Sequence, residues 1–269
     1  MATEVEPLGS VRIATDQPPV PRRVPIDAPW MWLAAGWRDM WCVPFISLGY
    51  GALFALGAAL LSGLLLRFQA LSLLLPLAGG FLLIGPFLAV GLYAASRQLS
   101  SGANVRLAAV AWSWTAARGQ LGFFGVALLI VYFGWLQAAF LLLMLFLGGA
   151  GLPPPDQFMH TLLFTPRGLG LLVVGTIVGS LLATLVFAIS AFAVPMLLAR
   201  SLDAVTAARA SVAAVALNPK PMALWAGLIA VIMAAGFACL LIGLVIAFPL
   251  IGHASWHAYV DVFGDPPKT

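Results

Sequence analysis

Charged side chains are scarce in this sequence of 269 residues. Asp, Glu, Lys and Arg make up 8% of it, against roughly a quarter in typical soluble domains, while 62% is hydrophobic. A chain this apolar has too few polar groups to cover a surface that faces water. The sequence therefore predicts an all-α, polytopic transmembrane helix bundle whose surroundings are the lipid bilayer, with no nucleic acid among its partners.

Cysteine and recognisable catalytic motifs are also scarce. Cys42 and Cys239 lie in apolar surroundings, and no CxxC or Cys/His cluster is present, which excludes a disulfide framework or zinc site of the usual spacing. We expect both to be buried small hydrophobes. No phosphate-binding glycine loop and no Ser/His/Asp arrangement can be placed, so the sequence predicts no enzyme and no bound cofactor.

Ionisable residues are missing from the middle of every apolar run. Ion- and proton-coupled transporters usually keep such a group near the middle of the membrane, so this absence argues against them.

The first 26 residues are polar and contain prolines, but lack the basic and apolar regions of a secretory signal. The sequence predicts a disordered cytoplasmic tail at 1–26, a single transmembrane domain at 27–263 and a C-terminal tail at 264–269.

Long apolar runs are what the sequence has in abundance. A helix needs about 20 residues to cross the hydrocarbon. Four runs meet this length, and a fifth run contains no Lys, Arg or Glu but is too long for one span and barely long enough for two. These runs are 43–66, 71–96, 121–147, 168–199 and 222–263. We therefore expect six spans, or alternatively five.

The order of segments indicates a three-fold repeat. Each unit contains a short amphipathic helix, an outgoing span and a returning helix with a proline, over 27–103, 104–200 and 201–263. In the third unit, the two apolar helices form a tight hairpin that turns near 236–243. Proline frees a carbonyl and kinks a helix. The predicted kinks are at Pro86, Pro195 and Pro249.

Aromatic and small residues suggest how these helices are held. Tryptophan and tyrosine favour the membrane–water interface, and small residues four apart let helices approach closely. The predicted interface anchors are Trp30, Trp37, Trp41, Trp112, Trp114, Trp256 and Tyr259. The predicted helix-packing residues are Ala55, Ala59, Gly63, Gly175, Gly179 and Ala183. The segment that begins at Asp27 is either an interfacial helix or an ordinary start to the first span.

Basic residues are distributed unevenly. Ten of the thirteen Lys and Arg residues lie in the N-terminal tail and in the segments that follow the second and fourth spans. Since such residues favour the cytoplasmic side, we expect a multi-pass protein of the inner membrane with a cytoplasmic N-terminus.

Two of the three histidines are close together near the C-terminus. His253 and His257 are four residues apart on one helical face, a spacing that can chelate a metal ion, with Asp261 or another chain as a third ligand. Alternatively, they hold the end of the helix through hydrogen bonds to carbonyls, or contact a partner. Both interpretations stay open.

Four segments together resemble the DUF2189 family of bacterial integral membrane proteins. They are LYAASRQLSSG at 92–102, VPMLLARSLDAVTAARAS at 194–211, Asn218-Pro219 and FPLIGHASWHAY at 248–259. The resemblance extends over roughly 40–263. It implies no established activity; a loose link with putative cytochrome c oxidases implies a respiratory setting in the bacterial inner membrane.

The expected function is a non-catalytic accessory subunit or assembly partner of a larger inner-membrane complex, with other membrane subunits as partners, including those of a respiratory terminal oxidase. The alternative is a transporter or scramblase-like carrier of lipid or a neutral solute, in which the interrupted helices move. A polar cavity between those helices would favour the carrier, and a lipid-facing groove filled by another subunit would favour the accessory role.

Overall fold

The computed structural model describes residues 19–113, 118–150 and 153–264, and within them it contains helices and no strand. This confirms the all-α prediction. The main helices are α1 (Ala28–Cys42), α2 (Pro44–Arg67), α3 (Leu74–Leu88), α4 (Val90–Ser100), α5 (Leu107–Ala111), α6 (Arg118–Leu147), α7 (Pro155–Phe164), α8 (Pro166–Ser190), α9 (Ala193–Ala199), α10 (Ala204–Leu217), α11 (Pro219–Ala238) and α12 (Leu244–Phe263).

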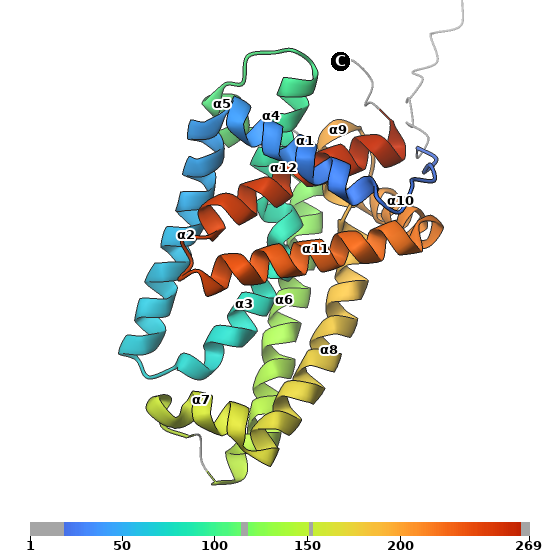
Figure 1. Ribbon diagram of the computed structural model, residues 1–269. Helices are drawn as coiled ribbons and strands as arrows, with labels where there is room; N and C mark the ends of the chain where they lie inside the picture. Colours follow the sequence, from blue (N-terminus) through green and yellow to red (C-terminus); the bar gives the residue numbers. More distant parts are fainter. Residues whose placement is uncertain (1–18, 114–117, 151–152, 265–269) are drawn as a thin grey trace, which may run out of the picture.

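Within the described residues, five helical segments are long and apolar enough to cross a membrane. They are Pro44–Arg67, Leu74–Ser100, Gly119–Leu147, Pro166–Ala199 and Pro219–Ala238. The multi-pass character is thus confirmed, and the number agrees with the five-span alternative. Figure 1 shows α2, α6 and α8 running roughly along the long axis of the molecule, whereas α11 and α12 run across it.

The helices α11 and α12 form the hairpin that was predicted, and it turns between Ala238 and Leu244. The turn reaches only the middle of the neighbouring helices, since the ring of Phe237, at the end of α11, lies 6.1 Å from that of Phe81, in the middle of α3. The end of α12 returns to the N-terminal segment, where the Arg22 N–H donates to the Val262 carbonyl at 2.8 Å. The two ends of the described chain therefore lie together.

Two of the long helices are interrupted next to the predicted proline kinks. The first interruption is at Ala89, three residues after Pro86, and the Tyr50 hydroxyl donates at 2.6 Å to the Leu88 carbonyl beside it. The second interruption, at residues 191–192, precedes Pro195. The Ser211 hydroxyl is inserted there, donating to the Ala188 carbonyl and accepting from the Phe192 N–H. Side chains of other helices thus satisfy the backbone groups that the interruptions release.

The third predicted kink does not interrupt its helix, because α12 continues through Pro249. Proline has no N–H, so the Val245 carbonyl four residues earlier has no helical donor. The backbone of α2 packs at this carbonyl, where a Cβ added to Gly51 would overlap its oxygen. A glycine is therefore required at the contact between α2 and α12.

Burial is concentrated at one end of the molecule, in a unit of α1, α4, α9, α10 and α12 that we call the head (Figure 1). All seven residues of α9 are buried, as are the first seven of α4. The helix α12 contacts α1, α2, α4, α9 and α11, and α1 approaches so closely that a Cβ on Gly36 would lie 2.6 Å from the Ala254 nitrogen. The stretch 248–259 is thus the centre of the fold.

The prediction that residues 1–26 are disordered is corrected for residues 19–26, which the structure describes as an ordered segment. Residues 1–18 lie outside the described part. Asn218 holds this segment, since its Oδ1 accepts from the Val24 N–H at 2.9 Å and its Nδ2 donates to the Arg22 carbonyl at 2.9 Å. The segment is ordered because a buried amide from the start of α11 pairs with its backbone.

The prediction that Cys42 and Cys239 are buried is also wrong, because both lie at helix ends and are exposed.

Other predicted divisions stay predictions. The three-fold repeat over 27–103, 104–200 and 201–263 is not tested by the order of helices alone. The second amphipathic segment contains only the short helix α5, and residues 114–117 lie outside the described part. Residues 265–269 of the predicted C-terminal tail also lie outside the described part.

Candidate functional site

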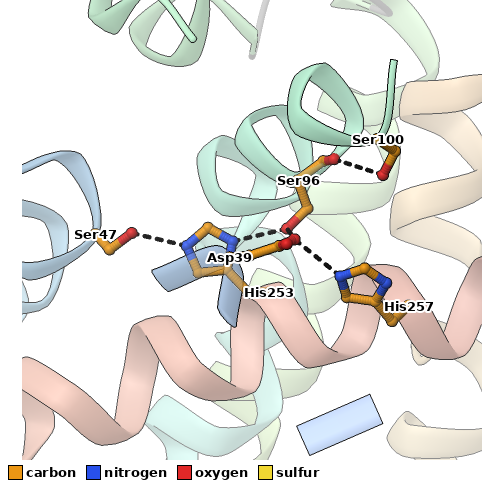
Figure 2. A network of polar contacts seen from close by, with 6 residues as sticks. All are labelled: Asp39, Ser47, Ser96, Ser100, His253 and His257. Atoms are coloured by element: carbon orange, nitrogen blue, oxygen red, sulfur yellow. Dashed lines mark hydrogen bonds and ion pairs between the residues drawn. The ribbon is translucent and has the colours of Figure 1, made fainter. Parts of the chain in front are cut away.

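A cluster of polar side chains joins α1, α2, α4 and α12 inside the head (Figure 2), and we call it the polar network. Asp39 from α1 lies at its centre. Its Oδ2 accepts from the Ser96 hydroxyl of α4 at 2.6 Å and contacts His257 Nε2 of α12 at 2.8 Å. His253, one helical turn before His257, lies between Ser96 and Ser47. The members are Asp39, Ser47, Ser96, Ser100, His253 and His257.

The hydrogen bonds assign the tautomer of His253. The Ser96 hydroxyl has one proton, which it donates to Asp39, so at 2.7 Å from His253 Nδ1 it can only accept. His253 therefore carries its proton on Nδ1. Its Nε2 then accepts from the Ser47 hydroxyl at 2.9 Å. A neutral imidazole satisfies both serines.

Burial and pairing shift the pKa values of two members, which lie outside the five candidate spans. Burial of His253, which is fully covered, lowers its pKa to about 4, because a charged ring would lose its water. Burial alone would raise the pKa of the Asp39 carboxyl, but the hydrogen bonds from His257 and Ser96 outweigh it and lower that pKa below the ordinary value. The network thus favours a neutral His253 beside an ionised Asp39.

The proposed metal ligands His253 and His257 each have other partners. His253 bonds to two serines and His257 to Asp39, while the suggested third ligand, Asp261, accepts from the Trp32 indole N–H at 2.9 Å. Among the described residues no group of three His, Cys, Asp or Glu side chains is placed to hold a metal. A metal shared by the two histidines would have to displace these bonds, so this assignment stays a prediction.

Two of the predicted interface anchors are instead core residues. Tyr259 is fully buried, and its hydroxyl accepts from Arg200 Nε at 3.0 Å. Trp256 is 1% exposed, and its indole N–H has no partner among the described residues. The prediction failed because α12 is enclosed by other helices, so that its aromatic residues pack inward rather than reach the interface.

The other predicted anchors face outward. Each side chain that the structure describes is at least 45% exposed: Trp30, Trp37, Trp41 and Trp112. The opposite face of α1, which carries Gly36 and Asp39, packs on α12. Trp114 lies outside the described residues. The amphipathic pattern of α1 is thus real, and the position of its tryptophans at a membrane interface stays a prediction.

An apolar cavity of about 480 Å³ opens between α3, α6, α7 and α8, and we call it the α3–α8 groove. Gly175, Gly179 and Ala183 line it, so this row of small residues faces the cavity. Gly179 contacts Trp135, whose indole N–H donates to the Pro76 carbonyl at 2.8 Å. The lining is apolar apart from three hydroxyl groups, those of Ser72, Thr176 and Ser180.

The second predicted row of small residues has little role inside the chain. Ala55 is buried, but Ala59 and Gly63 are exposed, and a Cβ on Gly63 would meet nothing within 4 Å. Ala59 and Gly63 are left exposed because α12 crosses α2 nearer to its start, at Gly51, and their packing against another helix stays a prediction.

Sequence reasoning identified the histidines but missed their partners. Asp39, Ser47 and Ser96 lie on three other helices, at sequence separations from His253 or His257 that reach 218 residues. One signal was available: Asp39 lies on the face of its helix opposite to the tryptophans. A carboxylate on that face indicates a buried polar contact.

Comparison with known proteins gives one match. No curated protein and no solved structure matches the chain. Residues 74–199, which run from α3 to the end of α9, match the model of a family described as a predicted integral membrane protein, DUF2189. The segment includes Leu92–Gly102 but not the stretch 248–259, so the match is shorter than the resemblance over 40–263. For residues 74–199, the match confirms that the chain resembles the DUF2189 family of predicted integral membrane proteins.

Proposed function

We propose that this protein is a non-catalytic integral membrane accessory subunit or assembly partner of a larger complex, and that its α3–α8 groove receives an apolar helix of a partner subunit. The observation that carries this proposal is the groove itself, about 480 Å³ of apolar space on helices that cross the membrane. Apolar surfaces of this kind are where membrane subunits pack, whereas a polar solute would need polar groups along its path.

The small residues of α8 favour a helix as the occupant. Gly175, Gly179 and Ala183 recur every four residues, so they form one row along the groove. A Cβ added to Gly175 would meet nothing within 4 Å, which leaves its backbone accessible. Rows of this type let two helix backbones approach closely and gain dispersion energy.

The polar network supports a structural role for its members. Asp39, His253 and His257 bond to one another or to serines of neighbouring helices, and none of them lines the α3–α8 groove. A catalytic or transporting group needs contact with its substrate. These groups instead join three helices of the head, α1, α4 and α12, to α2.

The proposed setting is the bacterial inner membrane, with the head and the N-terminus in the cytoplasm. Arg97 is in the last turn of α4 and Arg200 follows α9, both in the head. Arg67 ends α2 and Arg167 is at the start of α8, and these two helix ends lie away from the head in Figure 1. The excess of basic residues at the head supports this orientation. A respiratory terminal oxidase is the host complex that the family resemblance suggests.

Photo-cross-linking from inside the groove tests the accessory role. A photoreactive amino acid at Thr176, in the groove, should cross-link to one defined membrane protein in native membranes. The same group at Leu60, exposed on α2, should not. Filling the groove with Gly175→Leu should remove the cross-link. A reduced-minus-oxidised haem spectrum of the purified complex then tests whether that partner is an oxidase.

The second candidate is a carrier of lipid or a neutral solute. It is favoured by the interruption of the two helices that wall the groove, since both α3–α4 and α8–α9 have a break that could act as a hinge. Cross-linking of Thr176 only to lipid, with no protein product, would contradict the accessory role and favour the carrier.

A further inference from the structure

A second groove lies on the head, between α10 and the first turns of α6. It has a volume of about 580 Å³ and is distinct from the α3–α8 groove. Its walls are apolar and include Phe123, Ala127, Ala208 and Val212, of which Phe123 is 62% exposed. We call it the α6–α10 groove.

One cation lines this groove. Arg209 is exposed on α10 and shares its face with Val205 and Val212, which are four residues before it and three after it. In the described part of the chain, no carboxylate forms an ion pair with Arg209. The nearest acid along α10, Asp203, uses its Oδ1 to accept from the Thr206 N–H at the start of that helix. Among the acids that the structure describes, none therefore neutralises this arginine.

The position of the groove matches the boundary between headgroups and acyl chains. The candidate span of α6 begins at Gly119, and Phe123 and Ala127 are on its first three turns. Each residue advances about 1.5 Å along a helix, so the groove extends from the start of the span some 12 Å into it. This face combines exposed valines, which are unfavourable in water, with one arginine, which is unfavourable in the hydrocarbon. Such a face is stable where the two environments meet.

We propose that the α6–α10 groove binds an anionic phospholipid, with one acyl chain along Phe123 and the headgroup phosphate on Arg209. Guanidinium groups pair with phosphate through two parallel hydrogen bonds. Basic pockets between helices on the cytoplasmic side are where acidic headgroups bind. The lipid supplies an acyl chain that covers the apolar walls of the groove and a negative charge that pairs with Arg209.

Lipid titration of the purified full-length protein tests this site. The protein in detergent is titrated with phosphatidylglycerol and separately with phosphatidylcholine of the same acyl chains, and bound lipids are counted by native mass spectrometry. The wild type should prefer phosphatidylglycerol. Arg209→Gln should weaken its binding about fivefold, as expected for one basic residue, and Arg209→Lys should retain most of it.

Two further variants distinguish the effect of the Arg209 charge on lipid binding from the effect of the shape of the groove. Arg106→Gln removes another exposed arginine, outside the groove, and should leave binding unchanged. Ala208→Trp should fill the groove and weaken binding of both lipids. Equal affinity of Arg209→Gln and wild type for phosphatidylglycerol, or full binding by Ala208→Trp, would overturn the proposal. Competition by inorganic phosphate alone, without any effect of Ala208→Trp, would identify a phosphate ion rather than a lipid as the ligand.

Discussion

At the scale of single residues, Asp39 organises the polar centre of the head. It joins α1 to α4 through Ser96 and to α12 through His257. Removal of its charge should leave two donors without an acceptor of equal strength. We expect Asp39→Asn to lower the free energy of unfolding by about 1–3 kcal/mol. Thermal unfolding in detergent measures this, with Asp27→Asn, an exposed carboxylate without a side-chain cap bond, as the control.

The buried ring of His253 predicts a dependence of stability on pH. Its pKa in the fold is about 4, below the usual 6.5, so the unfolded chain binds more protons between these values. Stability is then complete above about pH 6.5 and falls as the pH drops to about 4, by about 3 kcal/mol. The contribution of Asp39, whose pKa is lowered below 3.8, is lost only under more acidic conditions.

A pH series of thermal midpoints checks this dependence. The wild-type midpoint should decrease steadily between pH 6.5 and 4, and His253→Gln should be less stable at neutral pH but flatter over the same range. Parallel curves for the two proteins would show that another group is responsible.

At the scale of elements, glycines determine which helices touch. The α1–α12 contact has no room at Gly36, where a Cβ would lie 2.6 Å from the Ala254 nitrogen, whereas a Cβ at Gly49 on α2 would meet nothing within 4 Å. Gly36→Ala should therefore destabilise the protein by about 1–3 kcal/mol through overpacking. Gly49→Ala should be neutral or stabilising by up to about 1 kcal/mol, because alanine favours helix. The same unfolding assay compares them, and equal effects would mean that α1 does not pack as described.

At the scale of the whole molecule, the α11–α12 hairpin decides how often the chain crosses the membrane. Its turn is apolar and exposed, with Leu240 at 84% and Ile242 at 71%, and it reaches the level of Phe81 in the middle of α3. We expect this turn to remain in the hydrocarbon, so that α11, although long enough to span, does not cross completely and both ends of the hairpin are on the side of the head.

Labelling of the two native cysteines tests this topology in intact cells and in lysed cells. Cys42 at the end of α1 should react with a water-soluble maleimide only after lysis, whereas Cys239 in the turn should react with an apolar maleimide alone. Reaction of Cys239 with the water-soluble reagent in intact cells would instead establish six complete spans.

Much of the architecture could be predicted from composition and local pattern. Apolar runs of sufficient length predicted the spans within a few residues, and the stretch after Met222, which has no Lys, Arg or Glu, indicated a hairpin with its turn near 236–243. Such features can be predicted because they are local. The thickness of the hydrocarbon determines how long an apolar run must be, and the helical period determines which residues share one face of the helix.

Contacts between distant residues required the folded chain. The partners Asp39 and Ser96 are 57 residues apart, and Trp32 and Asp261 are 229 apart. The burial of Trp256, the two grooves and the pairing of Asn218 with the N-terminal segment likewise depend on how helices cross. In a chain that is apolar nearly everywhere, hydrophobicity does not distinguish a side chain facing lipid from one facing another helix, so only the tertiary structure separates them.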